Sequence, residues 1–92
     1  TMGAKAALEN LGYSAGDVKL VGFDGASDAI AAMDEGWVHA DTAQMLYQMG
    51  YQGIKAAAAA ARGETVSSRI DTGFFLVTPS TSGVYKKMVG IN

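Results

Sequence analysis

The sequence predicts an α/β fold in which a parallel β-sheet is covered on both faces by helical crossovers, giving three layers. Helical patterns alternate with short apolar runs, in the order helix, strand, helix, strand, helix, strand. This alternation is typical of βαβ units, whose strands are parallel. Glycines stand at the ends of the predicted helices, where they allow the chain to turn. At 92 residues, the chain is long enough for one small domain.

The first half of the chain predicts a helix, a strand and a second helix. Residues Met2–Leu11 carry apolar side chains at helical spacing, and a glycine follows them. Residues Val18–Phe23 form a short run rich in β-branched and aromatic side chains, which predicts a buried strand. The turn at Asp24–Ala26 leads into a helix that Ser27 is expected to cap and that ends at the next glycine.

The second half predicts a weaker strand, a long helix and a final strand. Trp37–Ala43 is the weaker strand, and Met45–Arg62 is the helix, which includes a run of six alanines expected to pack against a sheet. Its expected buried face consists of Met45, Met49, Ile54, Ala57, Ala58 and Ala61. Ile70–Thr78 is the final strand, ended by a proline, and Val84–Val89 predicts a short terminal helix.

The composition indicates a globular protein and argues against several classes of function. Hydrophobic residues make up 49% of the chain and charged residues 17%, as in a packed domain. The net charge is −2 and the basic residues are scattered, so nucleic acid and anionic membranes are not expected partners. The absence of cysteine removes disulfides and thiolate metal sites. No apolar run is long enough to span a bilayer, and no signal peptide begins the chain.

The start of the chain reads as a helix already under way. Thr1 is not a natural initiator, and helix-forming residues follow it at once. We therefore expect the sequence to begin inside a larger protein.

Two polar residues follow predicted strands directly. Ligands of open parallel sheets bind just past the carboxyl ends of the strands. Asp24 follows the first strand and Gln44 the second, so both are predicted to project into one crevice if the strands are neighbours. A carboxylate accepts hydrogen bonds and a carboxamide donates and accepts them, which suits a neutral polyhydroxylated ligand. The alternatives are a turn aspartate bonded to its own backbone and a water-exposed glutamine at a helix start.

Several motifs resemble those of type I periplasmic sugar-binding proteins. In chain order they are L-V-G-F-D-G (Leu20–Gly25), D-E-G (Asp34–Gly36), A-D-T-A-Q with the later M-G (Ala40–Gly50), and D-T-G with L-V-T (Asp71–Thr78). The match runs through essentially the whole chain in order, and the combination is far more specific than any single motif.

The resemblance implies that residues 1–92 are the C-terminal part of such a protein, with the sheet in its C-terminal lobe. In the ribose-binding branch, the aspartate of the G-F-D-G turn and the glutamine of the A-Q segment bind sugar hydroxyls, and those positions here are Asp24 and Gln44. The implied function is sugar binding for an ABC-type importer, with neither a catalytic centre nor a cofactor or metal. The implied location is periplasmic or extracellular, with a lipid anchor in Gram-positive bacteria.

The implied partners are a monosaccharide or related polyol, the N-terminal lobe of the same protein and the transporter permease. A lone fragment would expose a sheet edge that the rest of the protein covers, so we also expect self-association.

The chain departs from the family pattern at a few positions. Asp41 stands where the family usually has threonine, and Trp37 stands where a small or basic residue is common. Pro79-Ser80-Thr81 follows the last strand, where asparagine or Lys-Glu-Asn is usual. These departures are expected to affect ligand preference and the return of the chain to the other lobe.

Other chemistry-bearing residues have structural explanations. His39 is the only histidine, so the chain cannot supply a histidine-based metal cluster, and an exposed strand position is expected for it. Trp37 lies at the amino end of its strand and is expected to pack or lie at the surface. Tyr47 and Tyr51 are one helical turn apart and are expected to flank the packing face of the long helix, although Tyr47 is close enough in sequence to Gln44 to contact a ligand.

Two other functions compete with sugar transport. The effector-binding domain of a LacI-type transcriptional repressor has the same fold, but such domains usually follow G-F-D with a second aspartate and later carry a proline pair. Here Gly25 follows Asp24, and the only proline is Pro79. A phosphoacceptor role for Asp24 would need an acidic metal pair at an earlier strand end, and none is visible.

Overall fold

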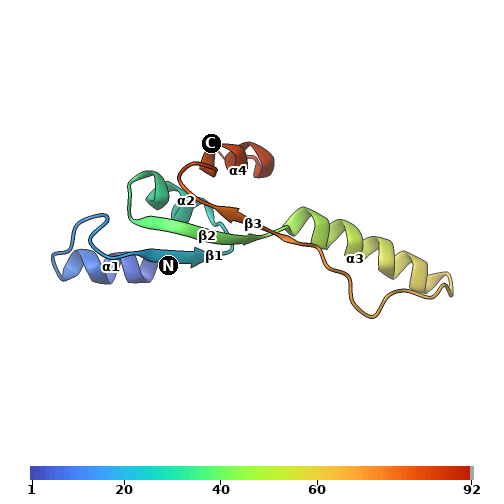
Figure 1. The fold of residues 1–92 in the computed structure, drawn as a ribbon. Coiled ribbons are helices and arrows are strands. Elements are labelled where there is room, and N and C mark those ends of the chain that lie inside the picture. Colours follow the sequence, from blue (N-terminus) through green and yellow to red (C-terminus); the bar gives the residue numbers. More distant parts are fainter. Residues whose placement is uncertain (92) are drawn as a thin grey trace. The chain divides into compact units, whose positions relative to one another are not determined.

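The computed structural model describes residues 1–91 of the chain (Figure 1). Its elements are α1 (Met2–Asn10), β1 (Leu20–Phe23), α2 (Ser27–Asp34), β2 (Val38–Gln44), α3 (Leu46–Ala61), β3 (Phe74–Val77) and α4 (Ser82–Val89). The chain divides into two compact units. The first contains Thr1–Ala43 and the segment from Phe75 onward, and the second contains Gln44–Phe74.

A sheet in the order β1-β2-β3 organises the first unit. β1 and β2 are parallel, with Leu20 opposite Val38 and Phe23 opposite Thr42, so the predicted parallel pairing of the first two strands is confirmed. β3 lies on the other side of β2 and runs in the opposite direction (Figure 1).

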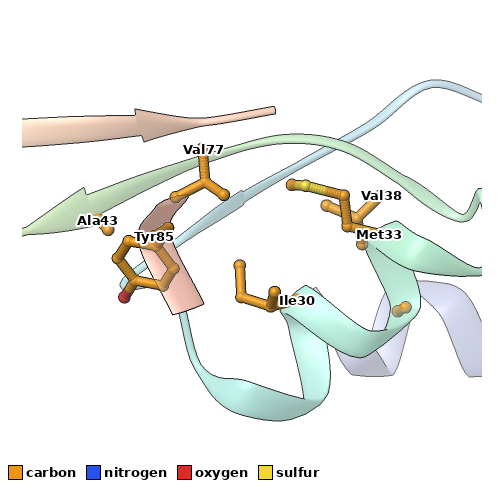
Figure 2. Packing of buried hydrophobic residues seen from close by; sticks show 7 residues of the cluster. Ile30, Met33, Val38, Ala43, Val77 and Tyr85 are labelled. Atoms are coloured by element: carbon orange, nitrogen blue, oxygen red, sulfur yellow. The ribbon is translucent and has the colours of Figure 1, made fainter. Parts of the chain in front are cut away.

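One face of the sheet carries the hydrophobic core (Figure 2). Ile30 and Met33 of α2 pack with Val38 of β2, Val77 of β3 and Tyr85 of α4, and all five side chains are buried. The ring of Phe75 lies 5.9 Å from that of Tyr85 and extends the cluster. α2 and α4 therefore form one helical layer over the sheet.

The opposite face of the sheet is apolar and exposed. Val21, Phe23 and Leu76 have 69%, 57% and 51% of their surface accessible. The expectation that β1 is a buried strand is therefore wrong for the described residues. The reason is that α2 and α4 pack on the other face, where Met2 of α1 also packs against the core. The α/β class is confirmed, and the second of the two predicted helical layers is not supplied by this unit.

The predicted glycine ends of the helices are confirmed, as Gly36 after α2 illustrates. It has a φ of 90°, and its N–H donates to the Met33 carbonyl oxygen at 3.0 Å. The N–H of Trp37 donates to the Ala32 carbonyl oxygen at 2.9 Å. This pair of bonds satisfies carbonyl groups that the end of a helix leaves unpaired.

The second unit consists of α3 and the segment that returns from it. α3 has no buried residues, so its predicted buried face is wrong, and so is the expectation that the alanine run packs closely against a sheet. Its partly covered residues form a different stripe, made of Gln48, Gln52, Ala56 and Ala59. One helix and one irregular segment offer too little surface to bury an apolar face.

The ends of the other elements differ little from the predictions. β2 and α4 begin within two residues of their predicted starts, but the last strand is shorter, because residues 70–73 are not in the sheet. Among residues 1–91, no helix combines the length and the apolar character needed to cross a membrane.

Candidate functional site

Asp24 lies in a strained turn directly after β1. Its φ is 78°, the one positive φ among the non-glycine residues described. Its side chain is exposed, and its backbone N–H donates to the Thr42 carbonyl oxygen at 2.9 Å, which continues the pairing of β1 with β2. An L-residue in this conformation costs roughly 1–2 kcal/mol. Such strain persists only where surrounding contacts over-determine the backbone, and it is concentrated at functional sites.

Gly25, the next residue, is held on both sides of its backbone. Its N–H donates to the Asp41 Oδ1 atom at 2.6 Å, and its carbonyl oxygen accepts from the Tyr85 hydroxyl at 3.0 Å. A Cβ atom here would lie 2.2 Å from the Tyr85 hydroxyl oxygen and 2.9 Å from the Ala43 Cβ atom, so only glycine fits. In the described residues, the turn is thus fixed by hydrogen bonds that Thr42 and Asp41 accept and Tyr85 donates, unlike an aspartate turn in which the carboxylate bonds its own backbone.

Asp41 is the residue that sequence reasoning missed as part of the site. It is 0% exposed, and its Oδ2 atom has no hydrogen-bond partner within residues 1–91. A Cβ atom on Gly22 would lie 2.6 Å from that oxygen, so the carboxylate fills the space that the glycine leaves. Position 41 shares the inward side of β2 with Ala43, two residues later, but Val38 is also buried and lies three residues earlier, so simple alternation from Val38 would not have placed Asp41 inside.

Burial changes the acid strength of two groups beneath the turn. It raises the pKa of the Asp41 carboxyl, the bond from Gly25 opposes this shift, and the negative charge of Asp24 adds to it. Burial also raises the pKa of the Tyr85 hydroxyl, and the charges of Asp41 and Asp24 act in the same direction. Tyr85 therefore keeps its proton and remains a donor to Gly25.

Gln44 is the last residue of β2 and the first of the second unit, and it is exposed. The pairing of Phe23 with Thr42 confirms that the two strands that carry Asp24 and Gln44 are parallel neighbours. That both side chains share one crevice stays a prediction.

The other residues singled out from the sequence have structural roles. His39 is partly buried, and its Nδ1 atom accepts a hydrogen bond from the Leu20 N–H at 3.3 Å, where the register between β1 and β2 shifts. Trp37 packs against the core, as expected, with the Lys5 ammonium 5.5 Å from its ring centre.

Charged and aromatic pairs lie elsewhere on the described chain. Tyr47 and Tyr51 stack on one another, with ring centres 6.3 Å apart. The Lys86 ammonium bonds Asp34, which lowers the pKa of that carboxyl and links α2 to α4. Residues 1–91 contain no cluster of three or more histidine or acidic side chains that would suit a metal ion.

The chain is similar in sequence to periplasmic binding proteins. Residues 1–65 match the family model of the periplasmic binding protein domain. The chain is 37% identical over 76 residues to the ribose import binding protein RbsB of Escherichia coli (strain K12), which is 83% of this chain and 25% of RbsB.

Two solved structures resemble this fold closely. An ABC transporter solute-binding protein from Agrobacterium vitis, bound to alpha-D-tagatopyranose, matches with a TM-score of 0.79 and 26% identity over 87% of this chain and 26% of its own. A carbohydrate transporter solute-binding protein from Agrobacterium radiobacter, in complex with D-arabinose, matches with a TM-score of 0.72 and 34% identity over 97% of this chain and 28% of its own. The chain thus spans about a quarter of the length of the relatives that it matches.

Proposed function

Because the chain belongs to the periplasmic binding protein family, we propose that it supplies part of the sugar site of a solute-binding protein for an ABC-type importer. The observation that carries this proposal is the geometry of Asp24. An exposed carboxylate is held in a strained turn at the carboxyl end of β1, beside a parallel strand that ends in Gln44. The carboxyl edge of parallel strands is where ligands of such sheets bind.

The chemistry of these two side chains fits a neutral sugar. The Asp24 carboxylate accepts hydrogen bonds from hydroxyl groups, and the Gln44 carboxamide both donates and accepts them. Hydrogen bonds to a charged group contribute about 1.5–3 kcal/mol each, so one carboxylate can account for a large part of the affinity for a monosaccharide.

The relatives indicate the ligand class and the context of the whole protein. Their names include ribose, tagatose and arabinose, so the proposed ligand is a monosaccharide or a related polyol. The remaining partners follow from the family: an N-terminal lobe that completes the site and a transporter permease that receives the sugar. The proposed location is the periplasm or the outer side of the cell membrane, and the proposed role is binding rather than catalysis.

The test is sugar binding by the complete protein that contains this sequence. Calorimetry with D-ribose, D-arabinose and D-tagatose is expected to detect at least one ligand. Asp24→Asn and Gln44→Ala are each expected to lower the affinity for that sugar by about tenfold or more, the effect of losing roughly 1.4 kcal/mol of binding free energy. Glu35→Gln is the matched control, since it also neutralises an exposed carboxylate but lies before β2, at the amino edge of the sheet. Unchanged affinity in Asp24→Asn would rule out the proposed site.

A further inference from the structure

Resting on the proposed function, we propose that Asp41 and Tyr85 are positioning residues, which hold the turn so that the Asp24 carboxylate meets a sugar hydroxyl. Neither side chain is proposed to contact the sugar. Asp41 is fully buried and Tyr85 is 4% exposed, so both act from beneath the turn.

The hydrogen bonds at the turn fix the backbone on both sides of Asp24. The peptide bond before Asp24 is held by the Asp24 N–H, which donates to the Thr42 carbonyl oxygen of β2. The peptide after it is held through the Gly25 N–H, which donates to Asp41. The Gly25 carbonyl oxygen accepts from Tyr85, whose side chain comes from α4, 60 residues later in the sequence. With these groups fixed, the direction of the Cα–Cβ bond of Asp24 is fixed as well.

The backbone of Asp24 needs such restraint, because an L-residue at a φ of 78° relaxes toward negative φ when it is free to do so. That relaxation would rotate the carboxylate away from its present direction. The hydrogen bond that Asp24 donates to Thr42 belongs to the strand pairing. The two bonds that side chains add against this rotation are the one accepted by Asp41 and the one donated by Tyr85.

Burying the Asp41 carboxylate to accept a hydrogen bond from one N–H group costs folding free energy. Its second oxygen is buried without a partner within the described residues, and a buried carboxylate in this state reduces stability. A neutral side chain of similar size would serve folding better. Its presence beneath the turn therefore points to a role in shaping the turn rather than in stabilising the sheet.

The location of both residues in the sequence supports the same conclusion. Asp41 comes from β2 and Tyr85 from α4, so two elements that are far apart in the sequence each contribute one hydrogen bond to Gly25. Figure 2 shows Tyr85 beside Ala43 at one end of the core, and a Cβ atom on Gly25 would contact both.

The experiment measures sugar affinity in the complete protein at a temperature where every variant is folded. Asp41→Ala is expected to weaken binding about tenfold, and Tyr85→Phe several-fold, since each releases one backbone group of the turn. Asp41→Asn retains an acceptor for the Gly25 N–H and is expected to recover most of the affinity. Val38→Ala truncates another buried residue of the same strand and is expected to bind as the wild type does.

A double-mutant cycle separates positioning from a general loss of structure. If Asp41 acts through Asp24, then Asp41→Ala causes no further loss of affinity in an Asp24→Ala background. Tyr85→Phe removes a single oxygen atom and keeps the ring in the core, so this arm remains informative if Asp41→Ala fails to fold. Wild-type affinity in both Asp41→Ala and Tyr85→Phe, with binding lost in Asp24→Ala, would overturn the positioning role alone. A wild-type protein that binds no sugar would instead overturn the proposed function.

Discussion

Among individual residues, Asp41 shows how a position can depart from a sequence pattern and still matter to the site. Reasoning from sequence placed Asp24 and Gln44 directly after two strands, because strand-forming runs and the turn residues that follow them are visible in the sequence. It did not place Asp41 beneath Asp24. That contact depends on which side of β2 faces the helices, and the strand contains too few apolar side chains to make its inward face obvious.

The raised pKa of Asp41 predicts a pH dependence of stability. Between its usual value and its raised value, the folded chain binds a proton at Asp41 that the unfolded chain does not bind. The free energy of unfolding is therefore expected to fall as the pH rises through that window. Asp34 affects the free energy of unfolding in the opposite direction. Its lowered pKa contributes stability that is lost only as the pH falls below the usual range of an aspartate.

Asp41→Asn isolates the contribution of Asp41. Urea unfolding at several pH values between about 4 and 8 is expected to show that the variant gains stability relative to the wild type as the pH rises. Asp34→Asn is the control, and its stability relative to the wild type is expected to stay nearly constant across this range, because the lowered pKa of Asp34 places its effect at lower pH. A constant difference between Asp41→Asn and the wild type across the range would show that Asp41 ionises normally.

Among the elements, the predictions succeeded where a local signal was sufficient. The end of α2 is specified by Gly36, which follows it, and β1 by a β-branched and aromatic run, and both signals act over a few residues. The buried face of α3 was predicted wrongly, because burial depends on what packs against the helix. Its apolar residues are regularly spaced, but the second unit holds no further helix or sheet layer to cover them.

Gly36 and Gly83 offer a matched pair of alanine substitutions at the element scale. Gly36→Ala places a Cβ atom on a residue with a φ of 90°, and we expect a loss of about 1–2 kcal/mol in the free energy of unfolding. Gly83 is helical, and a Cβ atom added there would meet no other atom within 4 Å, so Gly83→Ala is expected to be neutral or stabilising by up to about 1 kcal/mol. Chemical denaturation measures the free energy of unfolding of both variants. Equal effects would contradict the left-handed backbone conformation of Gly36 at the end of α2.

For the molecule as a whole, the exposed sheet face predicts association between copies of this chain. A contiguous apolar face on a small soluble unit is a common site of self-association. Sedimentation of the 92-residue chain is expected to show an average mass that rises with concentration. Val21→Lys, on that face, should reduce the effect, whereas Val84→Lys, at an exposed position of α4, should not. A strict monomer at high concentration would contradict this expectation.

The proposed sugar site also predicts a difference between this chain and the complete protein. The 92-residue chain supplies only part of the contacts, so its affinity for the sugar is expected to be at least about tenfold weaker in calorimetry. Equal affinity would show that residues 1–92 form the whole site.

The discontinuous first unit has a consequence for how this chain can be divided. β2 and β3 are neighbours that run in opposite directions, so the end of one lies beside the start of the other (Figure 1). The second unit is therefore, in topology, a long insertion at the tip of a β-hairpin. Replacing it with a short turn would leave the sheet, its covering helices and the Asp24 turn as one continuous module.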